Sequence, residues 1–87
     1  MSLSLSVIIP AYNEAARLGE TLRIVFEYLN QQVPESEVIV VDDGSTDNSR
    51  QVIESYGNRV IAIFQKNAGM GEALNTGIAQ AKGEIER

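Results

Sequence analysis

The residues best suited to chemistry are two adjacent carboxylates, Asp42 and Asp43, which follow directly on a run of apolar residues. Neighbouring carboxylates repel each other, so they need hydrogen-bond donors or a cation beside them. One interpretation is a turn, with Gly44 at positive φ and Ser45 or Thr46 capping a short helix. The other is recognition of a nucleobase N–H or a sugar hydroxyl, and the position of the pair at the end of an apolar strand favours recognition.

Two further segments carry polar and special residues. In Pro10-Ala-Tyr-Asn-Glu14, the ring of Tyr12 either closes the core or offers a platform for a nucleobase, and such stacking contributes about 1–3 kcal/mol per base. Glu14 is either a first-turn carboxylate favoured by the helix dipole or a hydrogen-bond partner for a ribose. Gly69-Met-Gly71 is either a tight loop or the start of a helix whose backbone N–H groups face a phosphate.

The composition excludes several kinds of site. The 87 residues include no Cys and no His, which rules out thiolate zinc sites, Cys nucleophiles and His-containing triads. Twelve acidic against seven basic residues give a net charge of −5, which disfavours nucleic acid as a partner. The apolar runs are far shorter than the ~20 residues that span a bilayer, so no membrane contact is visible and a cytoplasmic location is expected.

Spacing of apolar residues predicts alternating strands and helices. Strands are expected over residues 5–10, 37–42 and 60–64. Helices are expected over residues 14–32, from the turn at residues 44–47 through 56, and from 71 to a stop at Gly83. Asn13 is the expected N-cap of the first helix. The β-α-β-α-β-α order implies an α/β fold, a Rossmann-like parallel sheet with right-handed crossovers.

This topology predicts an incomplete sheet. The first two helices should lie on one face, and the third should cover the other face on its way to a fourth strand beside the first. The sequence pattern shows no fourth strand. We therefore expect an exposed edge on the first strand and an under-covered sheet face, with homo-oligomer formation as a consequence.

Three segments together resemble a known family. Ser6–Glu14, Val40–Asp47 and Asn67–Gly77 are similar, in order and spacing, to the opening of the family 2 glycosyltransferases, which are inverting enzymes of the GT-A fold. The resemblance covers about residues 5–84. It implies that residues 1–87 are the N-terminal, nucleotide-binding part of a GT-A domain.

The resemblance also implies the roles of individual residues. The first loop would lie against the base and ribose, Asp43 would read a base N–H with Asp42 beside it, and the third segment would border the ribose and diphosphate. The residues so assigned to nucleotide binding are Pro10, Ala11, Tyr12, Glu14, Asp42, Asp43, Asn67, Gly69 and Gly71. The usual donor of the family is a UDP-sugar, and GDP-mannose also occurs.

Two features of the family pattern are missing from these residues. The family places an Asp-x-Asp motif for Mn²⁺ or Mg²⁺ on the next strand and an acceptor-activating base further on, and neither is in the 87 residues. We therefore expect no metal site, no catalytic residue and no activity in this chain alone, with the full-length enzyme in the cytoplasm or at the cytoplasmic face of a membrane. A non-catalytic nucleotide-binding or assembly module is the alternative. A phosphoacceptor receiver domain is disfavoured, because its acidic pair follows the first strand.

Overall fold

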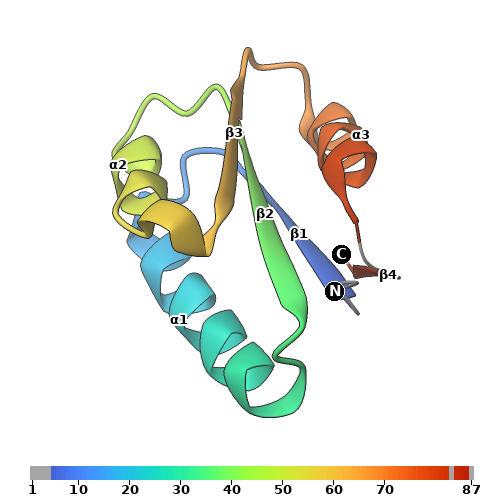
Figure 1. Cartoon of the computed structure of the whole chain (residues 1–87). Helices are drawn as coiled ribbons and strands as arrows, with labels where there is room; N and C mark the ends of the chain where they lie inside the picture. The colour runs from blue at the N-terminus through green and yellow to red at the C-terminus, as the bar shows by residue number, and fades with distance from the viewer. Residues whose placement is uncertain (1–4, 83, 87) are drawn as a thin grey trace.

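The computed structural model describes residues 5–82 and 84–86, which form one sheet with helices on both faces (Figure 1). Continuous apolar runs and apolar spacing of period 3.6 produce strands and helices close to where they predict them. The elements are β1 (Leu5–Ala11), α1 (Ala15–Gln32), β2 (Ser36–Asp43), α2 (Ser49–Glu54), the 3₁₀ turn η1 (Gly57–Arg59), β3 (Ile61–Gln65), α3 (Met70–Gln80) and β4 (Glu84–Glu86).

All strand pairs in the sheet are parallel, and the strand order is β3-β2-β1-β4. β1 and β2 are aligned along their length, from Leu5 opposite Ser36 to Ala11 opposite Asp42. The α/β class and the β-α-β-α-β-α order are confirmed. The expectation of no fourth strand is wrong, because the short β4 pairs with Leu5–Val7 of β1.

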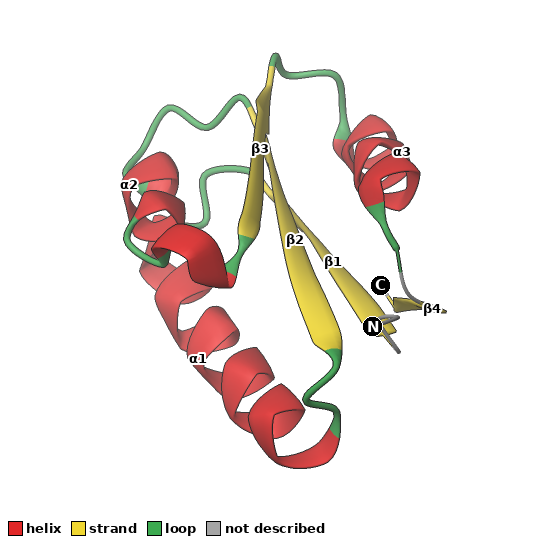
Figure 2. Cartoon of the chain, in the orientation of Figure 1, coloured by secondary structure: helices red, strands yellow, loops and turns green. Residues whose placement is uncertain are grey.

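The two faces of the sheet are covered by different helices, as the handedness of the crossovers predicts. α1 and α2 lie together on one face, and α3 lies on the other (Figure 2). Since successive strand residues point to opposite faces, Val38 and Val40 pack toward α1 while Ile39 and Val41 pack toward α3.

The predicted exposed edge and under-covered face need correction. β4 covers the outer edge of β1 along Leu5–Val7. Ile39 and Val41 on the α3 face are fully buried, because α3 packs across β1 and β2. Within the part of the chain that the structure describes, this face is more open toward the outer strand β3, where Ile61 is 39% exposed.

Two helix ends differ from prediction. Asn13 is not the N-cap of α1, since it adopts a left-handed conformation (φ 50°) and Glu14 occupies the N-cap position. α3 ends at Gln80, with Ala81 as C-cap, and the predicted stop at Gly83 lies outside the described residues.

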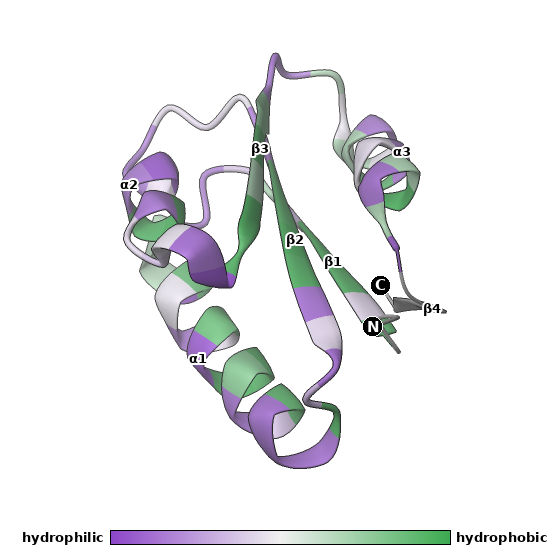
Figure 3. Ribbon diagram, viewed as in Figure 1, coloured by the Kyte–Doolittle hydropathy of each residue, from purple (hydrophilic) through white to green (hydrophobic). Residues whose placement is uncertain are grey.

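β1, β2 and β3 carry long hydrophobic stretches, whereas hydrophobic and hydrophilic residues alternate along the helices (Figure 3). The larger core cluster lies between the sheet and α1, around Leu18, Leu22 and Leu29, and each of these side chains is at most 3% exposed. Among the described residues, no helix combines the length and apolar character needed to cross a membrane. The predicted cytoplasmic location stays a prediction.

Candidate functional site

Three connections meet at the carboxyl edge of the sheet, beyond the ends of β1, β2 and β3 (Figure 1). They comprise residues 12–14, 44–48 and 66–69, which lie between each strand and the helix that follows it. In an open parallel sheet this edge is where ligands bind. The predicted site residues come from these connections and the strand and helix ends beside them.

The adjacent carboxylates point to opposite faces of the sheet, because they are consecutive residues of β2. Asp42 is 4% exposed and accepts a hydrogen bond from the Ser45 hydroxyl on the α1 face. Asp43 is 2% exposed on the α3 face. The alternating strand geometry thus separates the two charges, and each has its own donors.

The Asp43 carboxylate accepts three hydrogen bonds. Its Oδ1 accepts hydrogen bonds from Gln65 Nε2 and from the Ala68 N–H, and its Oδ2 accepts one from the Gly69 N–H, all at 2.9 Å. These donors, with Gln65 first, lower the pKa of Asp43 below its ordinary value. The carboxylate is therefore ionised at neutral pH and fixes the third connection to the end of β2.

Gly44 brings the second and third connections into contact. Its φ of 77° fulfils the predicted positive φ, and a Cβ placed there would lie 2.8 Å from the backbone nitrogen of Asn67. A side chain at position 44 would therefore push the two connections apart. Gly69, at the N-cap of α3, also has a positive φ, of 98°.

The first connection is bonded to the second through its backbone. The N–H groups of residues 13, 14 and 15 donate to Ser45 Oγ (2.9 Å), Ser49 Oγ (2.9 Å) and Asp47 Oδ2 (3.3 Å), respectively. In return, Asn13 Oδ1 accepts from the N–H groups of residues 46 (2.7 Å) and 47 (3.2 Å). The predicted helix cap by Ser45 or Thr46 is wrong, because the Ser49 N–H donates to Asp47 Oδ1 instead.

Sequence reasoning missed Asn13, Asp47 and Ser49 as parts of this site. The hydrogen bonds through which they join the first connection to the second link residues 32 to 35 positions apart, beyond the reach of local cap rules. The available signal was a residue tolerant of left-handed φ, Asn13, beside a turn rich in side-chain oxygens.

The predicted binding residues differ in what they can offer a ligand. Tyr12 is 39% exposed, and residues 67, 69 and 71 are exposed as well. Ala11 is fully buried in the core, which leaves only its backbone for a ligand, and Pro10 is half-buried. The carboxylate of Glu14 pairs with Arg17 at 3.0 Å.

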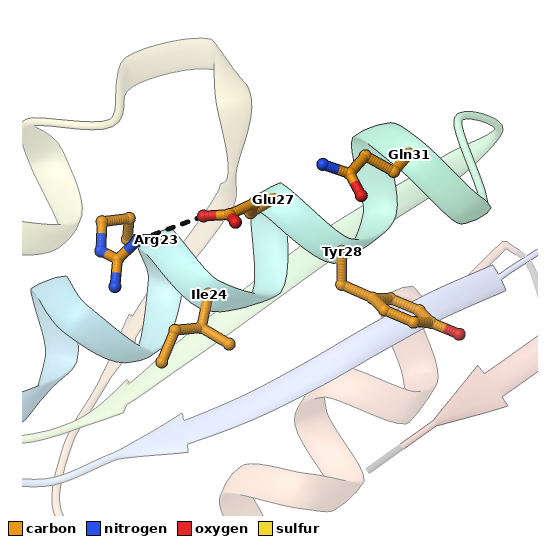
Figure 4. A pocket seen from close by; sticks show the side chains of 5 residues that line it. All are labelled: Arg23, Ile24, Glu27, Tyr28 and Gln31. Atoms are coloured by element: carbon orange, nitrogen blue, oxygen red, sulfur yellow. Dashed lines mark hydrogen bonds and ion pairs between the residues drawn. The ribbon is translucent and has the colours of Figure 1, made fainter.

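A separate open hollow lies on the outer surface of α1, away from these connections (Figure 4). It is lined by Arg23, Ile24, Glu27, Tyr28 and Gln31. α1 runs antiparallel to the strands, so this second half of the helix lies toward their amino ends. The hollow is therefore distinct from the three connections. Within residues 5–82 and 84–86, no three acidic side chains are grouped so that they could hold a metal ion.

Comparison with sequence models of protein families matches residues 6–85 to "Glycosyl transferase family 2". The chain belongs to this family. A relative, an uncharacterized glycosyltransferase of Nostoc sp. strain PCC 7120, is 44% identical over 95% of this chain and 26% of its own length. The chain thus spans about a quarter of that relative's length.

Solved structures agree with the family and the fold. A mannosyltransferase from Pyrobaculum calidifontis, in complex with GDP-Man and Mn²⁺, superimposes with a TM-score of 0.78 at 30% identity, over 98% of this chain and 26% of that one. S. aureus TarS residues 1–349, in complex with UDP-GlcNAc, gives a TM-score of 0.66 at 33% identity, over 95% of this chain and 25% of that one. The Rossmann-like sheet of this chain is thus shared with the GT-A glycosyltransferases.

Proposed function

We propose that this chain supplies the donor-nucleotide site of an inverting glycosyltransferase, which transfers a sugar from a UDP- or GDP-sugar to an acceptor hydroxyl. The observation that carries the proposal is the gathering of an exposed ring, Tyr12, and an ionised carboxylate, Asp43, at one sheet edge of a family 2 protein. The backbone of residues 66–71 borders the same edge. An aromatic face, a charged acceptor and backbone N–H groups are what a base, its N–H edge and a diphosphate require.

The hydrogen bonds of Asp43 leave one acceptor position of its carboxylate for a base. A carboxylate oxygen has two acceptor positions. Oδ1 uses two, for Gln65 and Ala68, while Oδ2 uses one, for Gly69, and retains a second. We assign this remaining position to a pyrimidine or guanine N–H. The three existing bonds keep the carboxylate in place before the base arrives, which lowers the cost of ordering on binding.

The remaining predicted residues complete the contact surface. The backbone of Pro10 and Ala11 would line the base beside Tyr12, and Glu14 would face the ribose. Asp42 would hold the second connection through Ser45. Asn67, Gly69 and Gly71 surround the start of α3, where the helix dipole favours a diphosphate.

We place the metal ligands and the base outside these 87 residues, in the remaining length of a protein as long as its relatives. Three carboxylates suited to a cation are not grouped in the described part of the chain, whereas a related mannosyltransferase contains Mn²⁺ with GDP-Man. Mg²⁺ or Mn²⁺ would stabilise the charge of the leaving diphosphate in the complete enzyme. The isolated chain should therefore bind nucleotide without metal and without turnover. Homo-oligomer formation stays a prediction.

A titration tests this function. Isotope-labelled chain is titrated with UDP, GDP and UDP-GlcNAc in the presence of EDTA, and amide chemical shifts are recorded. Shifts should concentrate in residues 11–14, 43–44 and 66–71, and Tyr12→Ala should weaken binding by roughly tenfold through loss of stacking. Tyr12→Phe is the matched control, because it retains the ring and should bind almost as well as the wild type.

Two results would contradict the proposal. One is no binding of either UDP or GDP at millimolar concentration. The other is binding whose shifts fall on the α1 hollow instead of the three connections. Hydrolysis or transfer of a nucleotide sugar by the purified chain would contradict the predicted inactivity alone.

A further inference from the structure

The first and second connections are joined by a reciprocal set of hydrogen bonds. Three consecutive N–H groups of the first connection and of the start of α1 donate to side chains of the second connection and of the start of α2. Two consecutive N–H groups of the second connection donate to a single side-chain oxygen of the first, Asn13 Oδ1. Because each side supplies both donors and acceptors, neither connection can move alone without breaking several bonds.

The start of α1 depends on this arrangement. The first N–H groups of a helix have no partner within the helix. Here no α1 side chain caps them, and the N–H groups of Glu14 and Ala15 donate instead to Ser49 and Asp47 of the neighbouring segment. Asp47 is held in turn by the Ser49 N–H and hydroxyl, at 2.9 and 2.6 Å. The pKa of Asp47 is lowered mainly by the hydrogen bond from the Ser49 side chain, so Asp47 stays charged at neutral pH.

Tyr12 lies between two fixed neighbours. On one side, Ala11 is fully buried in the core beneath α1. On the other, Asn13 is held by the second connection and adopts a left-handed conformation that is uncommon for residues other than glycine. The Tyr12 backbone is therefore fixed at both ends, although the residue as a whole is 39% exposed.

We propose that Asn13 and Asp47 are positioning residues, which hold Tyr12 where a base stacked on its ring can reach the Asp43 carboxylate. This inference rests on the proposed function. Neither side chain needs to touch the nucleotide. Their effect is to order the first connection before binding, so that the nucleotide does not have to do so.

The test compares Asn13→Gly with a matched control at the opposite edge of the sheet. Glycine accepts the left-handed φ of position 13, so this variant removes the side-chain oxygen without straining the backbone. The control is Glu37→Ala, because Glu37 Oε2 also accepts two hydrogen bonds from distant residues, one from Ser6 Oγ (2.6 Å) and one from the backbone N–H of Lys82 (2.7 Å).

Calorimetric titration with UDP and with GDP is performed at a temperature at which every variant is folded by circular dichroism. Asn13→Gly and Asp47→Ala should each weaken binding by roughly five- to tenfold, the cost of re-ordering a mobile ring and its loop. Glu37→Ala should change binding by less than a factor of two. Asn13→Asp, which keeps an acceptor oxygen at the same place, should recover most of the lost affinity.

A double variant supplies the readout that separates positioning from general stability. If Asn13 acts through Tyr12, then Tyr12→Ala combined with Asn13→Gly should bind no more weakly than Tyr12→Ala alone. A merely structural role would make the two losses multiply. Equal effects of Asn13→Gly and Glu37→Ala, or multiplying losses, would overturn the inference and leave the proposed function standing. Failure of the wild-type chain to bind UDP or GDP would remove both.

Discussion

On the face covered by α1 and α2, the sheet packs against large side chains such as Leu18, Leu22 and Leu29, whereas on the face covered by α3 it packs against Ala73 and Gly77. The helix backbone comes so close on the second face that a Cβ at position 77 would lie 2.4 Å from Ile8 Cγ2. The α1 face is therefore stabilised by the burial of large side chains. The α3 face is stabilised by the close approach of the helix backbone to the sheet, with only small side chains between them.

The two faces should respond oppositely to changes in side-chain size. Removing atoms from the α1 face leaves a cavity, while adding atoms to the α3 face forces the helix from the sheet. The two faces also have one feature in common. On each face, an aspartate accepts hydrogen bonds from the backbone at the start of the helix, and this aspartate is Asp47 for α1 and Asp43 for α3. Asp47 accepts from the first residue of α1, and Asp43 accepts from the two residues that precede α3.

The largest effect is expected from Leu22→Ala. Leu22 is fully buried in the α1 cluster, and such truncations lower the free energy of unfolding by about 2–5 kcal/mol. Urea denaturation measures the change. Ile24→Ala is the control in the same helix, because Ile24 is 54% exposed and should cost less than about 0.5 kcal/mol. Similar losses for the two variants would show that burial beneath α1 does not dominate the stability of this face.

A smaller decrease in the free energy of unfolding is expected from Gly77→Ala on the α3 face. The added methyl group meets Ile8, which is 1% exposed, and Val41, which is fully buried, so overpacking should outweigh the better helix propensity of alanine. The net loss in the free energy of unfolding should be about 1–2 kcal/mol. An unchanged or higher unfolding midpoint in urea would mean that α3 can move away from the sheet at no cost.

Gly19→Ala sharpens the comparison, because Gly19 is a helical glycine on the α1 side. A Cβ there would make an ordinary contact with Val52 Cγ1 at 3.9 Å. The substitution should therefore stabilise the protein by about 0.5–1 kcal/mol through helix propensity, the opposite sign to Gly77→Ala. Thermal unfolding of both variants side by side gives the sign directly, and a loss in both would contradict the difference between the faces.

The smallest effects on stability are expected from the protonation of Asp43 and Asp47 at low pH. The pKa values of Asp43 and Asp47 lie below the ordinary 3.8, so the folded state binds fewer protons than the unfolded state in that range. Their contribution to stability is thus complete above the ordinary aspartate pKa and is lost as the pH falls through the lower folded values. Asp43→Asn and Asp47→Asn should each reduce stability at neutral pH and make its acid dependence shallower, measured by urea denaturation as a function of pH.

Amide hydrogen exchange of the same two variants separates the faces. Asp47→Asn should speed exchange at the start of α1, and Asp43→Asn at residues 68 and 69, before α3. If both variants open the same segment, the two aspartates do not act on separate faces.

Local patterns in the sequence were sufficient for much of the fold. Continuous apolar runs located β1, β2 and β3, and apolar periodicity located α1, because both depend on residues close together in the chain. The handedness of parallel crossovers placed α3 on its own face. The same reasoning placed the candidate site at the carboxyl edge of the sheet. Gly44 also followed from a local rule, as a turn residue at positive φ.

Tertiary structure alone decided the rest, because the missing information lies in contacts between distant residues. The three residues of β4 have no pattern of their own and become a strand by pairing with β1. Asn13 takes its left-handed conformation and its role from oxygens and N–H groups more than 30 residues away, and not from the helix that it precedes. The sequence thus determined which elements form and where a ligand would bind, while the packed fold determined how the connections at that edge are held together.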